Sequence, residues 1–263
     1  TLKNKHGLAG CLAGQGKYNE AEALYISTLE AQEKNLGHDH PDVLRSKGDL
    51  ASCLYQQGKL SEAGALHRSV MQDSEKRLGP DHLVTLQNKL GLANCLADEG
   101  KHSEAESLYR STLQAREEKL GYDHPDVLRS KEIIARFFLR QGKLSEAEAL
   151  FQSTLKAQEN KLGHDHPETL FSKGNLAKCL CQQGKLSDAE CLYHSILETR
   201  AKKVGHDDLD ILLDKGLLAH CLLQQGKHSE AEPLLHTALE GFETAIGLEH
   251  PWTVWCKGAV EEC

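Results

Sequence analysis

The apolar positions of this chain recur at helical spacing, and no stretch alternates between apolar and polar residues as a strand does. One apolar stripe has the spacing i, i+6, i+7 and i+10 in Leu44, Leu50, Ala51 and Leu54. After a break at residues 57–58, a second stripe has the spacing i, i+3, i+4, i+7 and i+8 in Ala63, Leu66, His67, Val70 and Met71. Such stripes form the buried face of amphipathic helices. The pattern predicts two helices, over 42–56 and 61–77.

The whole chain is built from this helical pair, which returns every 42 residues. A glycine followed by lysine marks the break within each pair, at Gly16, Gly58, Gly100, Gly142, Gly184 and Gly226. A strict period of this length indicates one unit stacked in series, because a single unit cannot bury its apolar face alone. We therefore expect a helical solenoid, and the absence of strand patterning excludes an all-β propeller of similar period.

The ends of the expected helices carry recurring signals. A polar residue and an acid three positions later precede most second helices, in Asn19 with Glu22, Ser103 with Glu106, Ser145 with Glu148, Ser187 with Glu190 and Ser229 with Glu232. We interpret these pairs as capping boxes that satisfy free backbone amides, with Gly64 replacing the acid in the second repeat. A glycine after each second helix is expected to supply a left-handed turn. Proline then opens the next first helix, at Pro41, Pro125, Pro167 and Pro251.

The residues within the period distinguish between families of helical repeats. The segments LASCLYQQGKLSEAGALHRSVMQDSEKRLGPDH (50–82) and LAKCLCQQGKLSDAECLYHSILETRAKKVGHDD (176–208) resemble the long form of the tetratricopeptide repeat, found in kinesin light chains and nephrocystin-like proteins. The linker LGHDHPD (36–42) belongs to the same form. The core signature is a small residue on each helix, at Ala9, Ala51, Ala93, Ala135, Ala177 and Ala219 and at Ala21, Ala63, Ala105, Ala147, Ala189 and Ala231.

The resemblance covers the whole chain and implies its architecture. It predicts an all-α, right-handed solenoid of six helix pairs closed by a seventh first helix, as a single domain over 1–263. The repeats are expected near 1–41, 42–83, 84–125, 126–167, 168–209 and 210–250, with the terminal helix at 251–263.

In this family the first helices line a concave groove, so the resemblance assigns partner binding to defined positions on them. The residues expected to bind are Arg45, Asp49, Tyr55, Arg129, Arg136, Arg140, Phe171, Asn175, Lys178, Leu213 and Leu217. Groove positions of the six repeats hold six basic residues and three acids, which makes the groove net +3 in a chain of net −8. Three of the arginines share one helix face, and guanidinium binds carboxylates in bidentate fashion. An acidic partner segment is expected.

Two functions fit this groove. The first is an adaptor or scaffold for another protein or peptide, although kinesin light chains hold extended peptides partly through asparagines of which this chain keeps only Asn175. Leu213 and Leu217 make the sixth-repeat groove apolar, so the segment is acidic or mixed acidic and apolar. The alternative is an architectural subunit docked in a larger multiprotein assembly. A minor alternative is part of an enzyme whose catalytic domain lies outside this sequence.

Composition and charge limit the partners. Charged residues make up 27% of the chain, and no apolar run approaches the ~18 residues of a membrane helix. A net charge of −8 argues against nucleic acid, which needs a dense basic face. No cofactor and no catalysis are expected, because phosphate-binding glycine loops, HExxH and nucleophile elbows are all missing from the sequence. The chain begins Thr1-Leu2-Lys3, so we expect a fragment, with room for a targeting segment outside it.

The nine cysteines are best explained by packing. One repeat position holds Cys11, Cys53, Cys95, Cys179, Cys221 and Cys263, with Phe137 at the seventh. A position that accepts Cys or Phe is an apolar site, so we expect these thiols to be buried, free and in a reducing, cytoplasmic compartment. Cys179, Cys181, Cys191 and His194 cluster in the fifth repeat, but their spacing matches no standard zinc pattern, and no metal is expected.

Two further ladders follow the period. The triplet HDH at 38–40 and 164–166 resembles a metal site, but its repetition indicates an element that stabilises the turn. A lysine ladder runs through Lys5, Lys47, Lys89, Lys131, Lys173, Lys215 and Lys257 beside the buried stripe. Its lysines either extend along the apolar surface with their ammonium groups in water, which we favour, or form a basic rail for an anionic partner.

Overall fold

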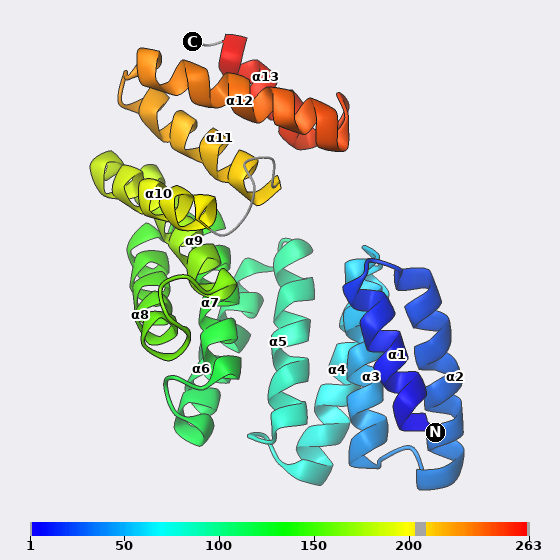
Figure 1. The fold of residues 1–263 in the computed structure, drawn as a ribbon. Helices are drawn as coiled ribbons and strands as arrows, with labels where there is room; N and C mark the ends of the chain where they lie inside the picture. Colours follow the sequence, from blue (N-terminus) through cyan, green and yellow to red (C-terminus); the bar gives the residue numbers. More distant parts are fainter. Residues whose placement is uncertain (1, 203–208, 262–263) are drawn as a thin grey trace. The chain divides into compact units, whose positions relative to one another are not determined.

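The computed structural model describes residues 2–202 and 209–261 and is entirely helical between turns in these ranges (Figure 1). The first helices of the pairs are α1 (Leu2–Gly14), α3 (Pro41–Gln56), α5 (Leu83–Asp98), α7 (Pro125–Arg140), α9 (Pro167–Gln182), α11 (Leu209–Gln224) and α13 (Pro251–Glu261). The second helices are α2 (Tyr18–Leu36), α4 (Leu60–Leu78), α6 (His102–Leu120), α8 (Leu144–Leu162), α10 (Leu186–Ala201) and α12 (His228–Ile246). The all-α series of helix pairs is confirmed. The helices expected over 42–56 and 61–77 begin or end within one residue of α3 and α4.

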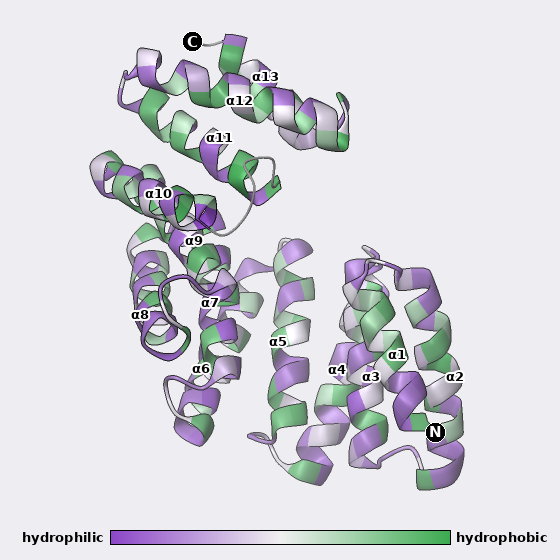
Figure 2. Cartoon of the chain, in the orientation of Figure 1, coloured by the Kyte–Doolittle hydropathy of each residue, from purple (hydrophilic) through white to green (hydrophobic). Residues whose placement is uncertain are grey.

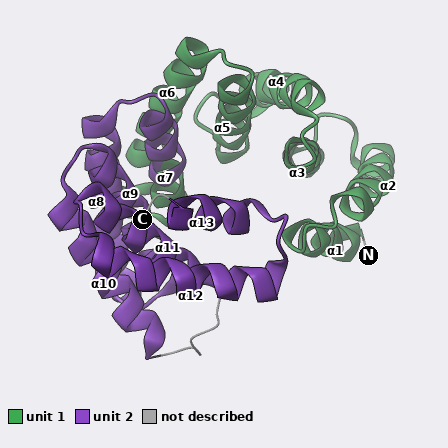
Figure 3. Ribbon diagram, turned by 90° about the horizontal axis from the view of Figure 1, so that it is seen from above, with its two compact units in different colours: residues 1–130 green, residues 131–263 purple. Residues whose placement is uncertain are grey.

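The chain forms two compact units, residues 1–130 and 131–263, and the boundary falls within α7 (Figure 3). In the first unit, consecutive helices from α1 to α6 pack against one another, and α3 also contacts α1 and α5. In the second unit the same order holds from α8 to α13, with α11 also contacting α9 and α13. The predicted handedness, the repeat boundaries and the single domain over 1–263 stay predictions.

The core of each unit lies between paired helices, whose apolar residues are interspersed with hydrophilic ones around each helix (Figure 2). All twelve alanines of the repeat signature are fully buried, as expected where two helices approach closely. Second helices add one large buried side chain each, in Tyr25, Tyr109, Phe151, Tyr193 and Leu235. In α4 this place is taken by His67, which is 1% exposed.

The linkers between repeats confirm the interpretation of the HDH triplet as a turn element. Gly37 has φ 83° and ψ 158°, a region open almost only to glycine and outside the left-handed helical region. The last histidine of the triplet is the N-cap of the next helix: Nδ1 of His40 accepts a hydrogen bond from the Asp42 amide at 3.2 Å. His82, His124, His166 and His250 make the equivalent bond. Proline follows four of these histidines and opens the next helix as expected, at Pro41, Pro125, Pro167 and Pro251.

α5 instead opens with Leu83, directly after His82. The first histidine of the triplet has a separate role, because His38 contacts Glu33 at 3.0 Å and His164 contacts Glu159 at 2.9 Å. Both contacts fix the end of the second helix to the turn. The fifth linker, residues 203–208, lies outside the described residues.

The expected capping boxes are wrong. The second helices begin one residue before Ser103, Ser145, Ser187 and Ser229, and Asn19 likewise lies inside α2. The N-cap is the lysine of the glycine-lysine pair, whose side chain makes no capping bond; Lys143, for example, has φ −80° and ψ 62°. The serine is therefore already within the first turn, and at three joints the acid binds residues of the next repeat.

Candidate functional site

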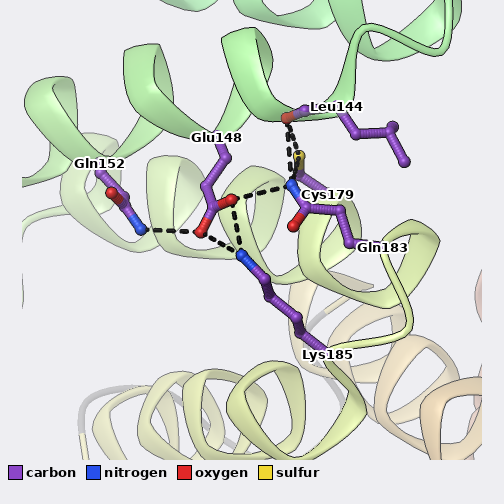
Figure 4. Close-up of polar contacts among 6 residues, drawn as sticks. All are labelled: Leu144, Glu148, Gln152, Cys179, Gln183 and Lys185. Carbon is purple, nitrogen blue, oxygen red and sulfur yellow. Dashed lines mark hydrogen bonds and ion pairs between the residues drawn. The ribbon is translucent and has the colours of Figure 1, made fainter.

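A polar cluster joins α2 to α3, α8 to α9 and α10 to α11, and Figure 4 shows the one between α8 and α9. Gln183, at the C-cap of α9, donates from Nε2 to the Leu144 carbonyl at 3.1 Å and to Glu148 at 2.9 Å. Lys185 adds an ion pair to the same carboxylate at 2.8 Å. The Cys179 thiol donates to the Leu144 carbonyl at 3.5 Å. One carboxylate and one carbonyl of α8 thus hold the end of α9, and the lysine of the glycine-lysine pair takes part in this contact.

The same cluster recurs in both units. Glu22 binds Gln57 and Lys59, and Glu190 binds Gln225 and Lys227. Hydrogen bonding to Gln57, together with Lys59, lowers the pKa of Glu22. The Lys227 ammonium is the main cause of the lowered pKa of Glu190. These carboxylates are structural, and sequence reasoning missed the role, although a glutamate and a glutamine 35 residues apart recur with the period.

The lysine ladder is paired with the second helices. Lys47 contacts Glu33 at 2.8 Å, Lys89 contacts Glu75 at 2.7 Å and Lys173 contacts Glu159 at 3.3 Å. The Lys47 ammonium is the main cause of the lowered pKa of Glu33. At these three positions the basic-rail interpretation is wrong, because each ammonium is bound to a carboxylate of the preceding helix and its side chain is at most 19% exposed. The expectation that the ammonium groups lie in water is wrong there for the same reason.

Most of the cysteine ladder is buried and free, as expected, in Cys53, Cys95, Cys179 and Cys221. The prediction is wrong for Cys11, which is exposed. The buried thiols pack against the second helix of the preceding repeat, as in the Cys53 bond to the Tyr18 carbonyl, and Cys11 lies in the first pair. Cys263 lies outside the described residues. Within residues 2–202 and 209–261, no group of histidine, cysteine and acidic side chains has the arrangement of a metal site.

A serine, a histidine and an aspartate meet between α1 and α3, but they do not form a usable nucleophile. His6 contacts Asp49 through Nε2 at 2.9 Å and Ser46 through Nδ1 at 3.4 Å. Ser46 is 2% exposed, so a substrate cannot reach its hydroxyl. Burial raises the pKa of Asp49, and the nearby His6 opposes this shift. The three residues connect the first two helix pairs.

The expected groove residues of the first unit differ in how freely they face solvent. Arg45 is exposed and pairs with Asp42 at 3.2 Å, within its own helix. Asp49 is half-buried and bound to His6. Tyr55 donates its hydroxyl to Asp98, which links α3 to α5. Asp49 and Tyr55 thus already have partners within the chain.

The second unit holds three exposed basic residues and one exposed aromatic residue of the expected set. Arg136 and Arg140 of α7 and Phe171 and Lys178 of α9 are exposed, as is Arg129 in the part of α7 that belongs to the first unit. The remaining expected residues, Asn175, Leu213 and Leu217, are half-buried.

The acid that accompanies these basic residues is turned to the interior. Glu132 of α7 accepts hydrogen bonds from Ser172 and Gln158, and burial raises its pKa. Its neighbours Arg136 and Arg140 remain exposed. The exposed charge of this stretch of α7 is therefore basic.

No helix among the described residues is both long and apolar enough to cross a membrane.

Comparisons with known proteins place the chain among helical repeat proteins. A family model described as tetratricopeptide repeat matches residues 1–76, 48–118, 85–160 and 126–202, and a second model of the same description matches 217–251. A comparison with curated proteins gave no match.

Solved structures agree with the family models. Kinesin light chain TPR-like repeats from Podosopora anserina share 26% identity, cover 79% of this chain and 98% of that chain, and superpose with a TM-score of 0.72. BtubC (BKLC) from P. vanneervenii shares 18% identity, with 89% and 94% covered and a TM-score of 0.73. The apo form of RapI shares 12% identity, with 99% and 70% covered and a TM-score of 0.78.

Proposed function

The chain belongs to the tetratricopeptide-repeat family and is of the kinesin light chain type, and from this premise we propose that it is a scaffold whose first helices bind an acidic segment of a partner protein. Proteins of this fold generally mediate contacts between proteins. Among the structural neighbours, YrrB is described as having an unusual peptide-binding site, and a Rap protein is complexed with Competence and Sporulation Factor.

The observation that carries the proposal is the basic, solvent-exposed stretch of α7. Arg136 and Arg140 lie one helical turn apart and are both exposed, while Glu132 on the same helix is held by Ser172 and Gln158. A partner carboxylate meeting this stretch finds guanidinium groups that form strong, charge-assisted hydrogen bonds. On α9, Phe171 and Lys178 offer an apolar surface and a further positive charge. The partner segment is therefore acidic, with an apolar residue beside the acids.

Charge reversal tests this proposal. A partner captured by the full chain is identified, and its binding is then measured against the variant Arg136→Glu with Arg140→Glu. We expect weaker binding, slower association and a smaller dependence on salt, with thermal unfolding nearly unchanged because exposed substitutions rarely exceed about 0.5 kcal/mol.

The matched control is Lys156→Glu with Lys202→Glu, which makes the same change of charge at exposed positions of α8 and at the end of α10. This control should bind the partner normally. If the control loses binding and the α7 variant keeps it, the partner docks on the second helices, and the chain is an architectural subunit of a larger assembly instead.

A further inference from the structure

The joint between the second and third repeats departs from the others at two linked positions. Gly64 of α4 stands where the other second helices carry Glu22, Glu106, Glu148, Glu190 and Glu232. Glu99 stands where the glutamine of the cluster is otherwise found, in Gln57, Gln141, Gln183 and Gln225. The carboxylate has thus moved from one side of the joint to the other, and Lys101 now contacts Glu99 at 2.7 Å.

The loss of the glutamate leaves Arg68 without a partner. In α6 and α8 the residue four positions later binds that glutamate: Arg110 contacts Glu106 at 2.9 Å, and Gln152 donates to Glu148 at 3.0 Å (Figure 4). Arg68 occupies the same position in α4 and is exposed. It makes no hydrogen bond or ion pair with any residue that the structure describes.

A cavity of about 400 Å³ opens where the glutamate is missing. Gly64 and Arg68 of α4 line one side of the cavity. Leu92 and Cys95 of α5 line the other side, together with Glu99 and Lys101. A Cβ atom built on Gly64 would lie 3.4 Å from the Cys95 Cβ and 4.0 Å from Glu99 Oε1, so a side chain at this position would contact α5 without clashing with it. The volume falls in the range of about 300–1,000 Å³ that is usual for ligand sites.

We propose that this cavity binds a glutamate side chain of a partner protein, which takes the place of the carboxylate that α4 lacks. The apolar surface of Leu92 and Cys95 accommodates the methylene groups of the ligand. Its carboxylate binds Arg68 and Lys101. These residues stand at the positions that Gln152 and Lys185 occupy around Glu148. Lys101 and Glu99 balance each other, so the charge left over is that of Arg68, and it selects an anion.

This site does not depend on the groove proposed above, because none of its residues belongs to the expected groove set. One variant of this site distinguishes binding of a partner carboxylate from a joint that is only less well packed. Glu99 competes with an incoming carboxylate for Lys101 and repels it. Glu99→Gln restores the glutamine of the regular joints and removes this repulsion, so it should strengthen binding, although it breaks an internal ion pair.

The test uses the full chain and a tetraglutamate peptide that is acetylated and amidated at its ends. Nuclear magnetic resonance titration follows the Gly64 amide and the Arg68 side chain, and tetraglutamine is the neutral control. The chain carries Arg136→Glu and Arg140→Glu throughout, so that the α7 basic stretch does not compete for the peptide. The resonances of both reporters should shift on addition of tetraglutamate and should not change on addition of tetraglutamine.

Four substitutions give the expected order of affinities. Gly64→Glu places the internal carboxylate of the other repeats in the cavity and should abolish binding, whereas Gly64→Ala should keep it. Arg68→Ala should weaken binding about tenfold, the loss expected for one charge-assisted hydrogen bond. Glu99→Gln should tighten it severalfold. Gly64→Glu introduces the residue that every other second helix carries, so its fold is expected to be intact, and its amide spectrum checks this.

The proposal is overturned if the two reporters do not respond to tetraglutamate, or if Gly64→Glu binds the peptide as well as Gly64→Ala does. It is also overturned if Glu99→Gln weakens binding. Any of these results leaves the proposed groove untouched, because that groove is tested by its own charge reversal.

Discussion

At the scale of single residues, His67 is a buried group whose charge state affects stability. Its ring fills the place that Tyr25, Tyr109 and Phe151 fill in other second helices, and Nδ1 contacts Asn88 Oδ1 at 2.9 Å. Burial lowers the pKa of His67, and the hydrogen bond with Asn88 opposes this only in part. The folded state therefore holds the ring neutral, while the unfolded chain takes up a proton near the ordinary value of about 6.5.

This difference predicts a loss of stability at mildly acidic pH. Below about pH 6.5 the unfolded state binds more protons than the folded one, so the free energy of unfolding falls as pH falls and stops falling only below the folded pKa. His67→Phe, the residue type found at Phe151, should remove this contribution. Urea unfolding at pH 7.5 and 5.5 measures it, with the exposed His236→Gln as control. Equal pH dependence in both variants would contradict the prediction.

The cysteines provide a second prediction at this scale. Burial raises the pKa of Cys53 and Cys179 and raises that of Cys95 to about 11, so these thiols are both shielded and protonated at neutral pH. Native labelling should be fast at the exposed Cys11 and Cys191 and slow at the buried ladder positions. Mass spectrometry of a labelling time course measures each site, and denaturant should remove the difference. Rapid native labelling of Cys53, Cys95 and Cys179 would refute their burial.

At the scale of elements, the helices were predictable and the joints between them were not. The ends of α3 and α4 follow from apolar spacing, Gly58 and Pro41, all of which act within a few residues. The role of Glu148 depends on Gln183 and Lys185, which lie 35 and 37 residues away in the chain. Local interpretation assigned that glutamate to a capping box, because Ser145 lies close in sequence. Cys11 was misjudged for a related reason, since the repeat position implies burial only where a preceding repeat covers it.

The joint predicts which of its residues stabilises the element most. Gln183→Ala should cost about 1 kcal/mol, because a half-buried amide that bonds both the Leu144 carbonyl and Glu148 is lost. Lys185→Ala should cost less, about 0.5 kcal/mol, since its side chain is 44% exposed and its ion pair is screened by solvent. Chemical unfolding compares the two, with the adjacent exposed Gln182→Ala as control. A larger cost at Lys185 would show that charge, not the amide, holds the joint.

At the scale of the whole molecule, the repeat determines the framework and the departures from it carry the specificity. The twelve signature alanines could be placed from the period alone. The period also gave the positions of the lysine ladder but not its ion pairs with the preceding helices. The expected groove residues were placed by family resemblance, and their exposure separates Arg136 and Arg140 from Asp49 and Tyr55, which are bound within the chain. No local sequence pattern predicts the contact between Asp49 and His6, because the two residues lie 43 positions apart on different helices.

Series stacking also predicts how damage spreads through the molecule. Ala147 of α8 is fully buried where helices approach closely, so Ala147→Leu overpacks the crossing at a cost of about 1–3 kcal/mol. In a stacked repeat protein each repeat is stabilised mainly by its neighbours. Hydrogen exchange should therefore show faster exchange in α7 to α10, while α1 to α4 keep their protection. Ser153→Ala, an exposed change on the same helix, serves as the control. Uniform loosening from α1 to α13 would mean that the chain unfolds as one cooperative block, and nearest-neighbour stacking would then fail as its description.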